Sequence, residues 1–194
     1  SQTISLTMNF EWNGGDGYKF TNIESDHFSG NIEIFPNGDK DIQLVSNDIN
    51  FDFSFLANPN RLINKTNLNL DLYGNLKFFD HTFKHIRVIA TGTKSTLQIG
   101  TIVADDIAIS GGSITSTGAH NIMIAMPING IAATCIFSGT PSDWQCDKFT
   151  YGDLHGSVSV SDKTYNMIVT SDKKMPNIKD AEQQLQKLGE YGTV

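Results

Sequence analysis

Long apolar runs and clusters of positive charge are both missing from this sequence. No stretch reaches the length of about eighteen apolar residues that a membrane-spanning helix needs, so none is predicted. The chain carries 14 Lys and Arg against 21 Asp and Glu, which gives a formal net charge of -7. Because phosphate binding needs clustered Lys and Arg, we expect no nucleic-acid partner, and electrostatic attachment to anionic lipid headgroups is disfavoured.

Motifs of catalysis are missing as well. The sequence has no nucleotide-binding glycine loop, no HExxH zinc motif, no GxSxG nucleophile turn and no CxxC pair. We therefore expect a protein that is not an enzyme and that needs no cofactor. The enzymatic alternative is a β-rich hydrolase, which requires two carboxylates facing each other across a cleft. Acidic pairs stand at Asp39 and Asp41 and at Asp105 and Asp106; they raise general acid and base chemistry or calcium binding, but we expect turn chemistry to explain both.

Apolar and polar residues alternate with a period of two in many segments of the chain. This pattern is typical of antiparallel strands with one apolar and one wet face. Clear examples are residues 49–55, 68–72 and 122–126. Turn signals separate such segments, and Pro36-Asn37-Gly38-Asp39 predicts a type I′ hairpin because Asn-Gly tolerates positive φ.

The expected fold is all-β and forms a single domain over residues 1–194. We predict an antiparallel meander that forms a long curved sheet, a sandwich or a partly open barrel. Strands occupy residues 1–175, and one short amphipathic C-terminal helix occupies residues 176–190.

With only one short helix to cover them, the apolar strand faces must pack against each other or line a groove for an apolar ligand. The candidate lining residues of such a groove are Phe51, Phe53, Phe55, Leu68, Leu70, Leu72, Ile122, Ile124 and Met126. These side chains fit a closed core equally well. Trp12 and Trp144 fit a core or a sugar-stacking platform, and we expect both in the core.

Cysteine occurs only twice, at Cys135 and Cys146, in the segment CIFSGTPSDWQC. A hairpin with the turn SGTPSD places Cys135 opposite Cys146 and Phe137 opposite Trp144, all on one face. We therefore predict a disulfide bond between the two cysteines, and two buried free thiols are the alternative. A disulfide indicates an oxidising compartment such as a periplasm or the cell exterior.

His81 and His85 are weak candidates for metal ligands. A strand places both on one face, together with Phe83, at a spacing that lets two imidazoles share a metal. Histidines on a wet face at an exposed turn give the same pattern, so no metal is predicted.

Two stretches of the sequence resemble a known family. FTYGDLHGSVSVSDKTYNMIVTSDKK, residues 149–174, and NLNLDLYGNLKFF, residues 67–79, resemble the repeating units of the AsmA-like proteins and the type II secretion protein N family. The resemblance implies an envelope protein with a long, curved antiparallel sheet. Its concave apolar side would guide lipids or scaffold a secretion apparatus, and the resemblance supplies no catalytic residues.

From these features we predict a non-enzymatic protein of the bacterial cell envelope, periplasmic or extracellular. Its one-sided apolar sheet would bind lipid or scaffold an envelope or secretion assembly, so its partners would be lipids or envelope proteins. The alternative is an extracellular or surface binding module, of adhesin or carbohydrate-binding type. Such a module would hold its ligand at loops near residues 12–17, 36–41 or 138–144.

Overall fold

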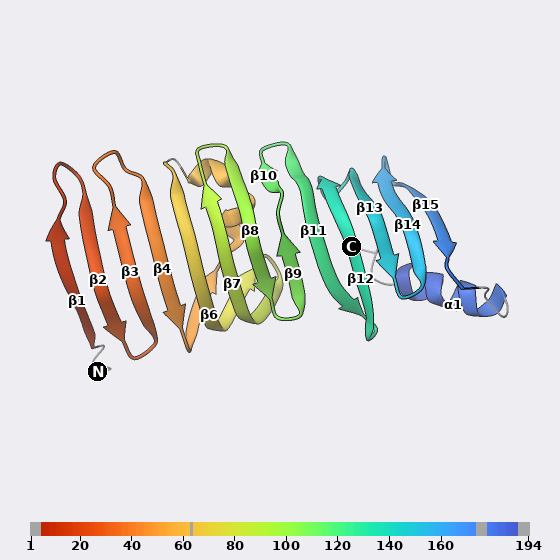
Figure 1. Cartoon of the computed structure of the whole chain (residues 1–194), viewed down its shortest axis with the longest axis horizontal. Coiled ribbons are helices and arrows are strands. Elements are labelled where there is room, and N and C mark those ends of the chain that lie inside the picture. Colours follow the sequence, from red (N-terminus) through yellow and green to blue (C-terminus); the bar gives the residue numbers. More distant parts are fainter. Residues whose placement is uncertain (1–4, 63, 174–177, 190–194) are drawn as a thin grey trace.

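One wide, open β-sheet makes up most of the described chain. The computed structural model describes residues 5–62, 64–173 and 178–189. Its 15 strands lie side by side in a single sheet, from β1 at one edge to β15 at the other (Figure 1). Within the described ranges no strand pairs with the outer edge of β1 or β15, so the sheet does not close into a barrel. The all-β prediction is confirmed, in its open-sheet form.

The strands follow one another along the sheet nearly in the order of the sequence. The first part of the sheet contains β1 (Leu6–Trp12), β2 (Tyr18–Ser25), β3 (Phe28–Ile34), β4 (Lys40–Ser46), β5 (Ile49–Asp52), β6 (Thr66–Phe78), β7 (His81–Gly92) and β8 (Thr96–Ala104). The second part contains β9 (Ile107–Ser110), β10 (Ser113–Thr115), β11 (Gly118–Ile128), β12 (Ile131–Gly139), β13 (Trp144–Tyr151), β14 (Leu154–Ser161) and β15 (Thr164–Ser171). Most neighbours are antiparallel, which confirms the predicted meander.

The meander is interrupted once, because β4 and β6 run parallel and β5 also runs parallel to β6. Parallel neighbours need a crossover, and the chain between β4 and β6 supplies it with β5 and two short 3₁₀ helices, η1 (Ser54–Ala57) and η2 (Pro59–Arg61). The crossover places Phe53, Leu56 and Leu62 against the sheet.

The strand predicted over residues 49–55 therefore ends early, at Asp52. The Asp52 carboxylate accepts hydrogen bonds from the Ser54 hydroxyl, at 2.5 Å, and from the Ser54 backbone amide, at 2.8 Å. These two bonds lower the pKa of the Asp52 carboxyl, the side-chain bond contributing most. A short polar side chain that binds the backbone two residues ahead favours a turn over a strand. The alternation of apolar and polar residues does not reveal such a side-chain hydrogen bond.

The two faces of the sheet differ in chemistry. Leu68, Leu70 and Leu72 of β6 are buried on one side, which we call the apolar face, while Asn67, Asn69 and Asp71 lie on the opposite side, the polar face. The strand register extends both faces to the neighbouring strands. The centre of the apolar face, under the crossover, is the main core, and Leu76, Val88 and Leu97 are fully buried there.

The hairpin predicted at residues 36–39 is present between β3 and β4, but the type I′ assignment is wrong. A type I′ turn over these four residues needs positive φ at both central residues, Asn37 and Gly38, but Asn37 does not have positive φ. Only Gly38 has positive φ in this turn, at 88°. Gly38 donates its amide to the Phe35 carbonyl at 2.8 Å, so the loop is a turn followed by a left-handed glycine.

The predicted C-terminal helix is present as α1 (Ile178–Gly189). Residues 176, 177 and 190 of the predicted range lie outside the described residues. In the described part of the chain, no helix has the length and apolar character needed to cross a membrane.

Gly74 is required for β5 to pair with β6. Its φ is +146°, and a Cβ atom at this position would lie 2.1 Å from the Ile49 carbonyl oxygen and 2.4 Å from the Ile49 nitrogen. We expect Gly74→Ala to lower the free energy of unfolding by about 2 kcal/mol or more, because backbone atoms must move apart. Urea unfolding measures this effect. Gly111→Ala is the matched control, since Gly111 also has positive φ but has open space around its Cβ position; equal losses would contradict the steric explanation.

Candidate functional site

The predicted lining residues all belong to the part of the chain that builds the apolar face or its cover. Phe53, Leu68, Leu70, Leu72 and Ile122 are buried in the main core; Phe55 and Ile124 pack against that core, Met126 is half-buried, and Phe51 is exposed. The crossover covers this central region with the Phe53, Leu56 and Leu62 side chains. The open part of the apolar face therefore lies elsewhere, toward the two ends of the sheet.

The N-terminal end of the apolar face is open. Phe10 and Trp12 of β1 have 59% and 64% of their surface exposed. The Phe10 ring lies 5.9 Å from the Tyr18 ring and 5.4 Å from the Phe20 ring, measured between centroids. We call the exposed residues here the open apolar patch; they are Leu6, Met8, Phe10, Trp12, Tyr18 and Phe28.

The prediction that Trp12 lies in the core is wrong. Trp12 alternates correctly with its neighbours, but it stands on the edge strand, so β2 covers it on one side only. Its indole Nε1 donates to the Gly15 carbonyl at 2.9 Å, which fixes the ring against the turn. Trp144 is half-buried and lies 6.0 Å from the Phe137 ring. A period-two pattern shows which face a side chain occupies but not whether another layer covers that face.

Charged side chains of β1 to β3 lie away from the open apolar patch. Register places Glu11 opposite Lys19, and Lys19 opposite Glu33, all on the polar face. The apolar-face positions between them are occupied by Phe10, Phe20 and Ile32, which are paired in the same way. These charged side chains therefore lie on one side of the three strands, and the residues that form the open apolar patch carry no charge.

The C-terminal end of the sheet exposes a second group of apolar side chains. Tyr165 and Met167 of β15 are exposed on the apolar face, opposite Val160 and Val158 of β14. Next to them is a smaller buried cluster built from Ala133, Phe149, Tyr151 and Leu154. The apolar face is thus closed in the middle by the crossover and open near both ends.

Cys135 and Cys146 lie on the apolar face of β12 and β13, but the predicted register is wrong. The structure pairs Phe137 with Cys146 and Gly139 with Trp144, because the strands extend further and the loop is shorter than the predicted SGTPSD turn. Cys135 is therefore the diagonal neighbour of Cys146. Their sulfur atoms are nevertheless only 2.6 Å apart, so the two side chains are placed for a bond.

The two thiols also influence each other's ionisation. The contact with Cys146 lowers the pKa of the Cys135 thiol, whereas the contact with Cys135 raises the pKa of the Cys146 thiol. The disulfide itself stays a prediction.

The histidine arrangement predicted from the sequence is wrong. Phe83 pairs with Leu76 and packs against the main core, whereas His85 pairs with Tyr73 on the polar face. The pairing shifts between them, because β6 has one more residue from Tyr73 to Leu76 than β7 has from His85 to Phe83. On the β7 side, the Asp105 carboxylate accepts hydrogen bonds from the Lys84 and His85 amides. A side chain supplied by a distant turn is invisible to local spacing.

His85 has a clear structural partner on the polar face. Its Nε2 lies 2.7 Å from the Asp71 carboxylate, and its ring stacks on Tyr73 at 4.2 Å between centroids. His81 is exposed at the start of β7. Among the residues that the structure describes, no group of three His, Cys, Asp or Glu side chains is arranged to hold a metal ion.

The loop sites of the alternative function are built from local hydrogen bonds. Asn37 and Asp39 bond to each other, and Asp39 also accepts the Lys65 amide at 3.2 Å. Asp105 is bound to the β7 backbone. Asp39 and Asp105 therefore act as turn residues, whereas Asp41 lies in β4 and accepts a hydrogen bond from the Asn67 side chain.

Comparison of the chain with protein-family models, with curated proteins and with solved structures gives no match. The resemblance to AsmA-like and type II secretion N proteins thus stays a prediction, and the open apolar face has to be interpreted from its own chemistry.

Proposed function

We propose that this chain is a non-enzymatic protein of the cell envelope whose apolar face holds the acyl chains of lipids. One observation carries the proposal: the open apolar patch around Phe10 and Trp12 stays exposed on strands whose other side is polar. A contiguous apolar patch rimmed by polar residues is typical of a ligand or partner site. The distance of 2.6 Å between the Cys135 and Cys146 sulfur atoms supports the predicted disulfide and so favours an oxidising envelope compartment.

The chemistry of the patch favours an acyl chain over a polar ligand. The side chains from Leu6 to Trp12 extend over about 20 Å along β1, at about 3.4 Å per residue. They offer apolar area and almost no hydrogen-bonding groups. An acyl chain needs no partner for polar atoms, and each methylene group that it buries contributes about 0.8 kcal/mol.

The edges of the sheet favour the scaffolding part of the predicted function. Among the described strands, β1 and β15 each have a neighbour on one side only. An unpaired strand edge presents backbone amides and carbonyls to which an extended segment of a partner can add. An envelope protein that supplies such a segment would continue the sheet and its apolar face.

A fluorescence titration with the fatty acid cis-parinaric acid tests the lipid proposal. We expect saturable binding to the unaltered chain and at least about tenfold weaker binding to the Phe10→Ser/Trp12→Ser variant, because two large apolar contacts are lost. Tyr73→Ser is the matched control, since Tyr73 is an exposed aromatic residue on the polar face. Equal affinity of all three proteins, or no binding at all, would sink the proposal.

A further inference from the structure

A continuous row of polar side chains crosses the polar face of the sheet. Strand register places these residues opposite one another, strand after strand: Glu11, Lys19, Glu33, Asp41, Asn67, Thr91, Gln98, Ser113 and His120. No apolar side chain interrupts the row. Since neighbouring strands lie about 4.8 Å apart, the row is about 38 Å long.

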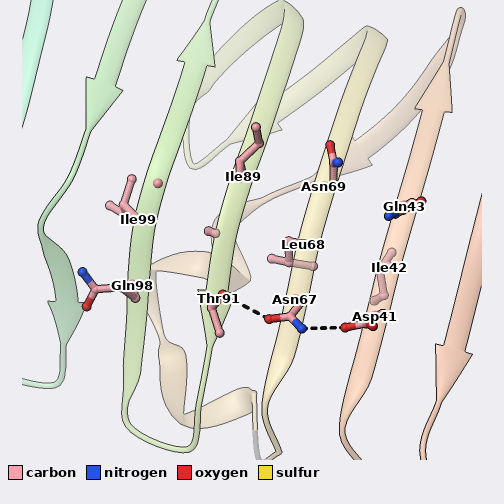
Figure 2. Close-up of a pocket in the computed structure, with 12 residues that line it drawn as sticks. Asp41, Ile42, Gln43, Asn67, Leu68, Asn69, Ile89, Thr91, Gln98 and Ile99 are labelled. Atoms are coloured by element: carbon pink, nitrogen blue, oxygen red, sulfur yellow. Dashed lines mark hydrogen bonds between the residues drawn. The ribbon is translucent and has the colours of Figure 1, made fainter.

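The middle of this row is hollowed, as Figure 2 shows. The hollow has a volume of about 500 Å³ and is lined by residues of β4, β6, β7 and β8. The pairing of β7 with β8 shifts between Ile89 and Ala90, which marks a bulge. Gly100 lies beside that bulge, and a Cβ atom there would come within 2.9 Å of the Ile89 carbonyl oxygen. The bulge and the missing side chain open the floor of the hollow.

A chain of hydrogen bonds fixes the side chains along the row. Asn67 Nδ2 donates to the Asp41 carboxylate at 2.6 Å, and the Thr91 hydroxyl donates to Asn67 Oδ1 at 3.1 Å (Figure 2). Further along, Gln98 Nε2 donates to the Gly112 carbonyl at 3.0 Å. Side chains that are already held in place lose little conformational freedom when a ligand binds.

The neighbouring row supplies carboxamides that are not engaged. Gln43 and Asn69 are register partners on the polar face, and both side chains are exposed in the hollow. Neither side-chain carboxamide forms a hydrogen bond with another described residue. Each therefore presents a carbonyl acceptor and two N–H donors to a ligand.

The lining selects for a neutral, hydroxyl-rich ligand. Among the described residues, no Lys or Arg lines the hollow, and Asp41, the one carboxylate among them that does, already accepts the bond from Asn67. Phosphates and acidic polymers thus find no cation in the hollow, and Lys19 of the same row lies between Glu11 and Glu33, whereas amides and hydroxyls match the hydroxyl groups of a sugar. Ile89, partly exposed in the hollow, provides an apolar contact for the C–H face of a sugar ring.

From this placement we propose that the polar row binds a neutral oligosaccharide in an extended, β-1,4-linked conformation. The row continues in register from strand to strand, so an extended chain lying along it meets a new polar side chain at every strand. A single sugar would contact only one or two strands. The site is on the opposite face from the open apolar patch, so it is independent of the lipid proposal.

Isothermal titration calorimetry of the full chain with three hexasaccharides tests this site. We expect saturable binding of cellohexaose or chitohexaose, and none of maltohexaose, because its α-1,4-linked chain coils and cannot follow the row across successive strands. The affinity of the Gln43→Ala/Asn69→Ala variant should be lower by at least about tenfold, since several hydrogen bonds are lost. Asn75→Ala is the control, because Asn75 lies on β6, exposed and outside the hollow, and it should bind as the unaltered chain does.

The variants change exposed side chains, so a circular dichroism spectrum equal to that of the unaltered chain is expected for each. The proposal is overturned by the absence of saturable binding to both cellohexaose and chitohexaose. It is equally overturned if maltohexaose binds as well as they do, or if the double variant keeps full affinity.

Discussion

Replacing Leu97 by alanine is expected to lower the free energy of unfolding by about 2–5 kcal/mol, the usual cost of removing a fully buried leucine side chain. Leu97 is 0% exposed and lies between Gly92 of β7 and Ile114 of β10, under the region that the crossover covers. Backbone hydrogen bonds between strands hold the surrounding strands in place, so they cannot move in to fill the cavity that the truncated side chain leaves. Urea unfolding measures the change, and the melting temperature should fall by about 10 °C.

Ile168→Ala is the matched control for this substitution. Ile168 is also a strand residue with a branched apolar side chain, but it is the most exposed large apolar residue of β15. Its removal should change stability by no more than about 0.5 kcal/mol. If both variants lost similar stability, or if Leu97→Ala lost less than about 1 kcal/mol, the centre of the apolar face would not be a closed core.

Oxidation of the cysteine pair is expected to stabilise the chain by about 3 kcal/mol, because the bond closes a short loop in the unfolded state. The sulfur atoms of Cys135 and Cys146 lie 2.6 Å apart, so bond formation needs only a small side-chain shift. The oxidised, denatured chain should be lighter than the reduced chain by two hydrogen atoms. Thermal unfolding with and without reductant measures the stabilisation.

The Cys135→Ser/Cys146→Ser variant is the control for the reductant, and its melting temperature should not respond to it. The predicted disulfide would be contradicted by two results together. Protein kept in oxidant and then denatured would show two titratable thiols per chain, and its melting temperature would equal that of the reduced form. The oxidising-compartment proposal would then lose its support.

Sequence patterns predicted the faces of the sheet better than its pairings. Alternation placed Leu68, Leu70 and Leu72 on one side, and the structure buries them there. The hairpin between β12 and β13 was predicted with Cys135 opposite Cys146, whereas the structure is shifted so that Phe137 faces Cys146. Which face a residue occupies depends on period two alone, but register also depends on turn length and on bulges such as the one near Lys148.

The sequence predicted the type of site but not its position on the sheet. A one-sided apolar sheet followed from the strands, but the sequence did not distinguish its covered part from its open part. Phe53 becomes buried because the Asp52 carboxylate turns the chain into η1, which lays the crossover over the centre of the sheet. Trp12 stays exposed because β1 is an edge strand. Both outcomes depend on strand order, which local patterns do not contain.

Native mass spectrometry of the chain as purified from cells tests directly whether the open apolar face holds acyl chains, as we propose. We expect lipid-sized adducts that disappear on denaturation, and that are much reduced for Phe10→Ser/Trp12→Ser but not for Tyr73→Ser. A bare mass for all three proteins, or adducts that do not respond to the Phe10 and Trp12 substitutions, would contradict it.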